Sequence, residues 1–339
     1  MRIAILGAGS LGTIIGALIT KGSGSDHDVV LIDSNEAHVK ELNNSGATIT
    51  GFLEMNVPVK AIMPAEMSGI YDIVILLTKQ TFNDVALKPL LKHLDENSTV
   101  CTLQNGIPEE FVAEYVGKSR TVGGAVGFGA TWIKPGVSML TSSYETVQNF
   151  AFDIGEIDGQ VTPRILKVKD VLSHVGNTDV MTNLMDVRWT KVLMNATFSG
   201  MSAALGCTFG EVLDNRTAME ALAYVADEVI KTANAHGYKM VFMQGKEMSD
   251  LEILKDETPA DKFDFYHEVW GRHRALKASM LQDLEKGIPC EIDFINGFVA
   301  RKGKEKGLYT PYNNLIVSLV KEAEKHKVVP KFEENIKHF

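Results

Sequence analysis

The chain has 339 residues, of which 45% are hydrophobic and 23% charged, a balance that is ordinary for a globular protein of two domains. A net charge of −9 argues against a nucleic-acid partner, and no apolar run reaches the roughly 18 residues of a membrane span. Cys101, Cys207 and Cys290 lack metal-ligand spacing, so we expect free thiols, no metal site and a cytoplasmic location.

The first predicted strand ends in a glycine-rich turn. Residues 2–6 are mostly apolar, as in a strand buried on both faces of a parallel sheet, and a helical run follows at 13–20. Between them lies Gly7-Ala8-Gly9-Ser10-Leu11-Gly12, a G-x-G-x-x-G pattern typical of dinucleotide binding. Gly7 permits the tight turn, Gly9 lets the backbone approach a pyrophosphate, and Gly12 lets the helix pack on the strand. We therefore predict that a nucleotide cofactor binds here, at the helix N-terminus.

Short apolar strands alternate with helical stretches through the first half of the chain. Strands are predicted at 29–32, 73–77 and 99–103, and this alternation implies the parallel βαβ units of a doubly wound, Rossmann-type α/β sheet. Polar side chains come just past these strands, where ligands of such sheets bind: Asp33, Lys79 and Asn105. Solvated loops also carry such residues, but three of them at the edge that holds the glycine turn favour a site.

Asp33 lies where the acid that binds a ribose 2′-hydroxyl is usually found. A carboxylate there repels a 2′-phosphate, and no arginine follows within residues 34–36, so NAD is favoured over NADP. Ser34 and Asn35 could still hydrogen-bond a phosphate, which leaves NADP open.

The pattern changes after residue 136. Residues 137–140 and 150–154 are strand-like, and we expect them to form an antiparallel edge that closes the sheet. One more helix and strand are expected between 165 and 181. The sequence thus predicts a dinucleotide-binding domain at 1–183 and an all-α substrate and catalytic domain at 184–339.

The second half has the longer periodicity of helices, and one of them carries a polar stripe. Helices are expected around 187–204, 211–236, 262–286, 291–306 and 311–326. In the first, Lys191, Asn195 and Ser199 recur at i, i+4 and i+8 and share one face. A lysine in such a helix is often a snorkelling surface residue, but this stripe also suits the wall of a buried site. A partly desolvated ammonium loses its proton more readily, so Lys191 could act as a general acid toward an alkoxide.

Glu291 follows a proline that marks a helix start at Pro289. An acid in the first turn of a helix is favoured by the helix dipole alone, so the local sequence leaves a structural and a catalytic interpretation of Glu291 open.

Taken together, these residues resemble the ketopantoate reductase family, the 2-dehydropantoate 2-reductases, over nearly the whole chain. Five blocks in order carry the resemblance: residues 7–12, 78–80, 103–106, 189–191 with Asn195, and 279–283 leading to 291–297. The last block is the most specific, because its twelve-residue spacing from Ser279 to Glu291 matches the family.

The resemblance implies NAD(P)H-dependent reduction of 2-dehydropantoate to D-pantoate, a step of pantothenate biosynthesis. Lys191 matches the family's proton donor, and Glu291 matches the acid beside that lysine and the nicotinamide ribose. Asn105 matches a residue that touches both cofactor and substrate, while Lys79 and Ala130 match cofactor contacts.

The same resemblance assigns substrate-binding roles to Asn195 and to Ser279, which matches a donor to the substrate carboxylate. Two positions depart from the family. Ser199 stands where a second asparagine is usual, and Ser34 stands where an arginine commonly holds the phosphate of NADP, which reinforces NAD. A homodimer through the helical domain is also expected, because members of this family often pair in that way.

Both departures keep alternatives open. Relatives of this fold include NAD-dependent dehydrogenases of D-2-hydroxy acids such as D-mandelate, and this chain could be one of them. A non-catalytic NAD(P)-sensing protein is a remote third hypothesis. A sensor needs only the glycine turn, whereas this chain also has Lys191, Asn195, Ser279 and Glu291 together.

Overall fold

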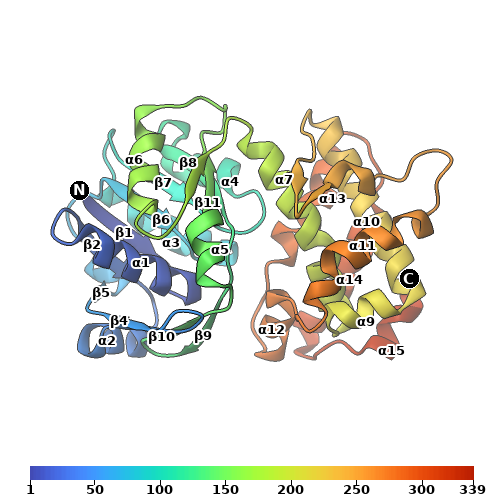
Figure 1. Cartoon of the computed structure of the whole chain (residues 1–339), viewed down its shortest axis with the longest axis horizontal. Coiled ribbons are helices and arrows are strands. Elements are labelled where there is room, and N and C mark those ends of the chain that lie inside the picture. Colours follow the sequence, from blue (N-terminus) through green and yellow to red (C-terminus); the bar gives the residue numbers. More distant parts are fainter. The chain divides into compact units, whose positions relative to one another are not determined.

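Strand β1 (Arg2–Leu6) lies inside a large sheet because its four apolar residues are buried on both faces. The computed structural model describes residues 1–339 and gives this sheet eight strands in the order β12-β11-β8-β7-β6-β1-β2-β5. Five strands continue the parallel arrangement around β1: β2 (Asp28–Ile32), β5 (Lys60–Ile62), β6 (Ile73–Leu76), β7 (Thr99–Thr102) and β8 (Thr121–Val126). The predicted α/β sheet of the Rossmann type is confirmed (Figure 1).

Helices cover both faces of this sheet because successive side chains of a strand point in opposite directions. Ile3 and Ile5 pack in one apolar cluster with α1 (Ser10–Ser23) and α6 (Pro163–Leu172). Ala4 and Leu6 pack in a second cluster on the other face with α3 (Asn83–Leu90) and α4 (Glu109–Val116). This is the doubly wound arrangement, which puts the carboxyl ends of the parallel strands at one edge.

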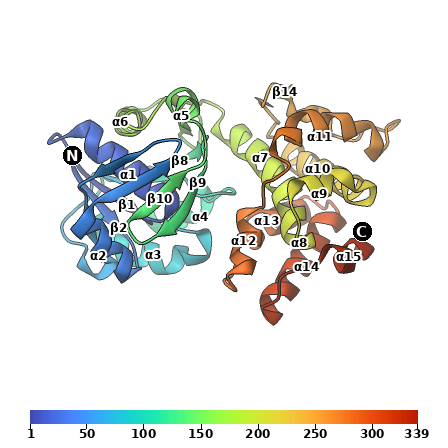
Figure 2. The ribbon, with the colours of Figure 1, turned by 60° about the horizontal axis from the view of Figure 1, so that its bottom comes forward.

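The predicted antiparallel edge is confirmed for one of its two strands and wrong for the other. Strand β11 (Phe152–Gly155) does pair antiparallel with β8, and β12 (Thr178–Val180) lies beyond it. Residues 137–140, however, form β10 (Val137–Leu140) in a separate four-stranded sheet with β9 (Ala130–Lys134), β3 (Ala47–Gly51) and β4 (Met55–Val57). The reason is the tight turn at Gly136, where φ is +73°, which folds β10 back on β9 so that both pack over α1 (Figure 2).

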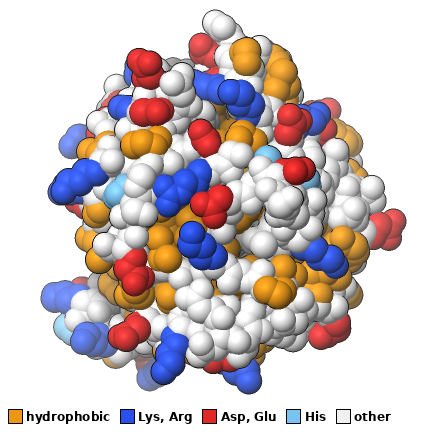
Figure 3. All heavy atoms as spheres, turned by 90° about the vertical axis from the view of Figure 1, so that its left-hand side faces the viewer, with side chains coloured by type: hydrophobic (Ala, Val, Ile, Leu, Met, Phe, Trp, Pro, Cys, Tyr) orange, Lys and Arg blue, Asp and Glu red, His pale blue; other side chains and the backbone are white.

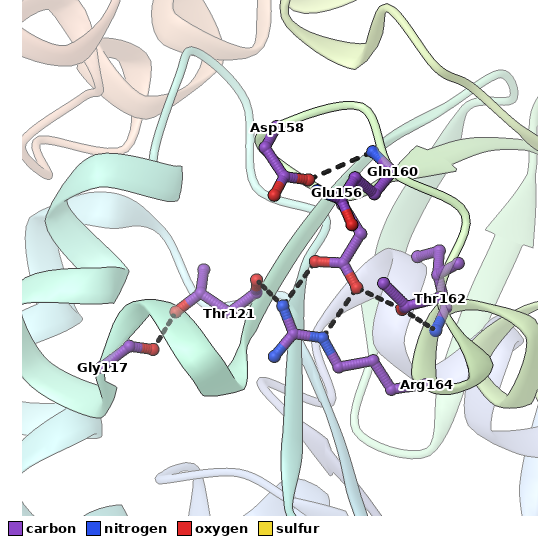
Figure 4. Close-up of polar contacts among 8 residues, drawn as sticks. Gly117, Thr121, Glu156, Asp158, Gln160, Thr162 and Arg164 are labelled. Atoms are coloured by element: carbon purple, nitrogen blue, oxygen red, sulfur yellow. Dashed lines mark hydrogen bonds and ion pairs between the residues drawn. The ribbon is translucent and has the colours of Figure 1, made fainter.

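A buried ion pair ties the edge of the large sheet to α6 (Figure 4). The Glu156 side chain is 4% exposed and accepts hydrogen bonds from Arg164 Nε at 2.7 Å, from Arg164 Nη2 and from Thr162 Oγ1 at 2.5 Å. Arg164 also donates to the Thr121 carbonyl at 3.4 Å, at the start of β8. The bidentate pair therefore joins the residue after β11 to α6, eight residues further on, and connects both to the start of β8, 43 residues before Arg164.

We expect Arg164→Ala to lower the free energy of unfolding by about 2 kcal/mol, because it leaves the Glu156 carboxylate buried with fewer donors. The loss is at the low end for a buried pair, since the Arg164 side chain is 28% exposed and water can reach the site. Urea unfolding measures this change. A double variant, Glu156→Leu with Arg164→Leu, should recover most of the loss, and a double variant as unstable as the single one would refute the explanation.

The face of the molecule drawn in Figure 3 carries no large field of one charge. Figure 3 shows acidic and basic side chains interspersed over it, with hydrophobic side chains in small groups between them. None of the helices in the structure combines the length and apolar composition needed to cross a lipid bilayer.

The chain divides into two compact units, Met1–Gln104 with Pro108–Leu184, and Asn105–Ile107 with Met185–Phe339. The sequence-based division at 183 and 184 did not foresee that Asn105–Ile107 would pack with the second unit, where Ile107 is 5% exposed in the core. The second unit is helical apart from the short hairpin β13 (Phe242–Met243) and β14 (Lys246–Glu247).

Three of the five expected long helices are interrupted, and a fourth starts late. The first consists of α7 (Leu184–Met194), a π-helical turn (Asn195–Ser199) and α8 (Gly200–Leu205). The second splits into α9 (Phe209–Asp214) and α10 (Arg216–Ala235), because Asn215 caps α10 by accepting the Ala218 N–H at 3.0 Å. The third splits into α11 (Phe263–Trp270) and α12 (Ser279–Glu285), separated by an exposed polar stretch.

The last helices of the chain pack against the core of the second unit. The helix expected from residue 291 begins at Asn296, as α13 (Asn296–Glu305), after a 3₁₀ turn (Ile292–Phe294). Helix α14 (Pro311–His326) has the expected bounds, and a short α15 (Phe332–Asn335) follows it.

Candidate functional site

The glycine turn after β1 is held against the end of β2. The N–H groups of Gly7 and Ala8 donate to the Ile32 carbonyl at 2.9 and 3.1 Å. A Cβ atom on Gly7, where φ is +99°, would lie 2.5 Å from the Thr78 nitrogen, and one on Gly12 would lie 2.1 Å from the Gly7 carbonyl oxygen. The fold itself therefore requires glycine at both ends of the motif.

Gly9, in the middle of the motif, is different. A Cβ atom there would meet no atom within 4 Å, so the packing of the chain does not require glycine at this position. Gly9 is the N-cap of α1, which has neither a side-chain cap nor an acidic residue in its first turn. Open space in front of an uncapped helix N-terminus fits a bound pyrophosphate, which would accept the N–H groups that the helix leaves unpaired. Ser10 and Leu11 are half-buried beside this space, while Ala8 is buried.

Asp33 is the first residue after β2, directly beyond the Ile32 carbonyl that holds the glycine turn. Its Oδ1 accepts the Asn35 N–H at 2.9 Å, and Asn35 Oδ1 accepts the His38 N–H at 3.1 Å as the N-cap of α2 (Glu36–Ser45). The Asp33 carboxylate is thus oriented by the backbone, and the Asn35 side chain is occupied as a helix cap.

Sequence reasoning missed His38, which fixes the middle of the glycine turn. His38 Nδ1 accepts the Gly136 N–H at 2.9 Å, so its proton is on Nε2, which donates to the Ala8 carbonyl at 2.7 Å. Thr13 Oγ1 donates to the same carbonyl at 2.7 Å. A single histidine in a polar helix gives no signal of this role, because its partners lie 30 and 98 residues away.

Lys79 and Asn105 follow β6 and β7, and both are half-buried. The loops that carry them are joined by Gln104, whose side-chain amide donates to the Thr78 carbonyl at 2.7 Å and to Asn83 Oδ1 at 2.6 Å. Ala130, the remaining predicted cofactor contact, is half-buried at the start of β9. Of these residues only Asn105 packs with the second unit.

In the second unit, the helix that carries Lys191 is buried almost all round. Lys191, Asn195 and Ser199 are half-buried, whereas Val192, Leu193 and residues 196–198 are buried. An uninterrupted α-helix would rotate Ser199 by about 80° from Lys191. The π turn changes this, because the Gly200 N–H reaches back five residues to the Asn195 carbonyl and widens the turn. The stripe therefore depends on a helix irregularity that the i, i+4, i+8 spacing does not reveal.

Glu291 is 8% exposed in the connection between α12 and α13. Helix α13 begins only at Asn296, so Glu291 is not in its first turn but is the N-cap residue of the preceding 3₁₀ turn. Burying a carboxylate costs free energy unless the group interacts with partners. The burial of Glu291 therefore favours a specific role for this side chain over that of an ordinary surface acid. Ser279 is the first residue of α12 and is exposed.

Residues 3–151 match the family model for ketopantoate reductase PanE/ApbA, and residues 183–324 match the model of its C-terminal part. The chain belongs to the ketopantoate reductase family. The family predicted from the five sequence blocks is confirmed, and in this family member each block falls within one of the two matched regions.

The alignments with individual relatives cover nearly the whole chain. The 2-dehydropantoate 2-reductase of Pyrococcus abyssi is 30% identical over 328 residues, which cover 96% of this chain and 98% of the relative. A D-mandelate dehydrogenase in complex with NADH is 26% identical, with a TM-score of 0.78 and coverage of 96% and 99%. The dimeric ketopantoate reductase of Staphylococcus aureus is 18% identical, with a TM-score of 0.73 and coverage of 96% and 100%, a likeness that shows the fold alone.

Proposed function

We propose that the protein reduces 2-dehydropantoate to D-pantoate with NADH or NADPH and so supplies pantothenate biosynthesis. The observation that carries this proposal is Lys191 on the half-buried polar face of an otherwise buried helix, in a chain with an intact dinucleotide turn. The Pyrococcus abyssi relative, named for this reaction, supports the choice of substrate.

In the proposed mechanism, the bound nicotinamide supplies the hydride and the protein supplies the proton. The glycine turn and the N-terminus of α1 bind the pyrophosphate, and Asp33 accepts a hydrogen bond from the ribose. Lys79, Asn105 and Ala130 are the proposed further contacts of the cofactor. Together these residues hold the nicotinamide in place.

Lys191 Nζ is the proposed proton donor to the oxygen of the 2-oxo acid. A positioned ammonium stabilises the negative charge that develops on that oxygen, and Glu291 holds the ammonium in place and keeps it charged. Asn105, Asn195 and Ser199 are the proposed hydrogen-bonding partners of the substrate, and Ser279 is the proposed donor to its carboxylate.

We propose NADH as the preferred cofactor. The oriented Asp33 carboxylate, Asn35 occupied as a helix cap, and Ser34 in place of a phosphate-binding arginine all support this preference. The NADH-bound D-mandelate dehydrogenase relative supports it too.

Asp33→Ala combined with Ser34→Arg should therefore move the ratio of kcat/KM for NADPH over NADH upward by about tenfold to a hundredfold. The change removes the carboxylate that repels a 2′-phosphate and adds a guanidinium that binds it. Steady-state kinetics with both cofactors measure the ratio. Ser34→Ala is the matched control, and a ratio unchanged in the double variant would refute the role of Asp33.

A second function is favoured by Ser199 and by the D-mandelate dehydrogenase relative. A serine is shorter than the usual asparagine and leaves room for a larger substrate side chain, as a dehydrogenase of branched or aromatic D-2-hydroxy acids needs. The test is oxidation of NADH and NADPH with 2-dehydropantoate and with benzoylformate. Preference for 2-dehydropantoate supports the first function, preference for benzoylformate the second, and cofactor binding without any turnover would identify a nucleotide sensor.

We also propose a cytoplasmic homodimer that pairs through the helical unit. None of the three buried cysteines forms a disulfide, as is usual in a reducing compartment. The Staphylococcus aureus protein, which has the same fold, is itself dimeric.

A further inference from the structure

Side chains donate hydrogen bonds to backbone carbonyls in, and directly before, the π turn that carries Asn195 and Ser199. Thr197 Oγ1 donates to the carbonyls of Leu193 and Met194, at 2.8 and 3.0 Å. The Ala196 carbonyl accepts a hydrogen bond from Asn296 Nδ2 at 3.0 Å, a donor that comes from α13. Buried carbonyls need such partners, so a side chain one hundred residues further along the chain completes this turn.

Asn296 is the first member of a buried chain of hydrogen bonds. Its Nδ2 also donates to Asn313 Oδ1 at 3.0 Å, and Asn313 Nδ2 donates to Glu228 Oε2 at 2.7 Å. The Glu228 carboxylate accepts the N–H groups of Tyr312 and Asn313, at 2.9 Å each, in the first turn of α14. Both asparagines are fully buried, and Glu228 is 8% exposed. Burial raises the pKa of the Glu228 carboxyl, and the hydrogen bonds from Asn313 oppose that rise.

The stability of the fold does not account for the burial of the oxygen atom of the Asn296 amide. Asn296 Oδ1 is buried and has no hydrogen-bond partner, which costs stability that an apolar residue of similar shape would not lose. Asn296 also packs directly on α8, since a Cβ atom on Gly200 would lie 2.7 Å from Oδ1 and 3.0 Å from Nδ2. Residue 200 directly follows the π turn, so the amide is in contact with the turn at both of its ends.

We propose that Asn296 and Asn313 are positioning residues that hold the π turn and so orient Asn195 and Ser199 relative to Lys191. This inference rests on the proposed reduction of a 2-oxo acid. Asn296 fixes the Ala196 carbonyl, and Asn313, anchored by Glu228, fixes the rotation of the Asn296 amide. The two asparagines therefore affect how the oxo acid is bound and oriented. Binding of NADH, which we assign to the glycine turn, is unaffected.

The test is Asn296→Leu, which keeps a similar shape, removes the donor to Ala196 and leaves little room for water. We expect kcat/KM for the 2-oxo acid to fall about tenfold to a hundredfold, because small displacements of positioning groups have effects of this size. The dissociation constant of NADH should change by less than about twofold. Asn296→Ala is the second variant, whose smaller side chain admits a water molecule that can replace the donor, so we expect a smaller loss.

Leu251→Ala is the matched control, because it removes packing from the same core without touching the network. Thermal unfolding compares the variants. The proposal predicts a larger loss of kcat/KM in Asn296→Leu than in Leu251→Ala at equal or smaller loss of stability. It is overturned if Asn296→Leu keeps full kcat/KM, or if activity follows stability in both variants. Absence of turnover in the unmodified enzyme would instead reject the proposed function, and this inference with it.

Discussion

Replacing Lys191 with alanine is expected to lower kcat by about two to four orders of magnitude, the range that a positioned general acid contributes. The alkoxide formed by hydride transfer would lose both its proton donor and the positive charge that stabilises it. The expected loss is in kcat, because the ammonium interacts most strongly with charge that develops only in the transition state. Steady-state kinetics with a saturating cofactor measure it.

Two controls separate this loss from an effect on folding or on cofactor binding. Lys191→Ala leaves the buried Glu291 carboxylate without the ammonium proposed beside it, so we expect a lower thermal midpoint but a nearly unchanged dissociation constant of NADH. Thr190→Ala, one residue away on the buried side, is the matched change. It removes the hydroxyl that donates to the Asp186 carbonyl and accepts the Val241 N–H, so it should cost stability more than kcat. Near-normal kcat in Lys191→Ala would remove the proton-donor role.

Two glycines of the same motif are expected to respond differently to alanine. Gly12→Ala places a Cβ atom 2.1 Å from the Gly7 carbonyl oxygen, so the backbone must move, and we expect a loss of about 3 kcal/mol or more in the free energy of unfolding. Gly9→Ala places its Cβ atom in open space, so no neighbouring atom has to move to accommodate it. The loss of stability should therefore be much smaller than in Gly12→Ala, because no steric clash forces the backbone to move.

Affinity for NADH should nevertheless fall in Gly9→Ala, by about tenfold to a hundredfold, because the methyl group occupies the place proposed for the pyrophosphate. Urea unfolding and fluorescence titration with NADH measure the two properties. Gly24→Ala would be a poor control, because φ is +53° there, whereas Gly271→Ala has both open space and a negative φ. Unchanged NADH affinity in Gly9→Ala would contradict the proposed cofactor site.

The cofactor unit could be predicted largely from the sequence because its signals are local. An apolar strand followed directly by three spaced glycines specifies a turn, a helix and their contact within twelve residues, and Asp33 is one residue beyond a strand. The structure adds that Gly7 and Gly12 are needed by the fold, whereas Gly9 is not. That distinction depends on atoms of Thr78 and Gly7, which the motif alone does not locate.

The remaining features could not be predicted because they depend on contacts between distant segments. Strand β10 pairs with β3, about ninety residues earlier, so its own pattern could not exclude the main sheet. The π turn is completed by Asn296, and His38 acts through Ala8 and Gly136. The helix break at Asn215 depends on a side-chain cap, and the break after Trp270 is a short exposed stretch between two helical patterns, so neither stands out in the sequence.

The most direct test of the account is a crystal structure of the enzyme with NADH and a 2-oxo acid analogue that cannot be reduced. We expect Lys191 Nζ to lie within hydrogen-bonding distance, about 3 Å, of the oxo oxygen, with the Glu291 carboxylate beside it. This expectation would be contradicted by a Lys191 amine that faces bulk water while another group or a water molecule contacts that oxygen.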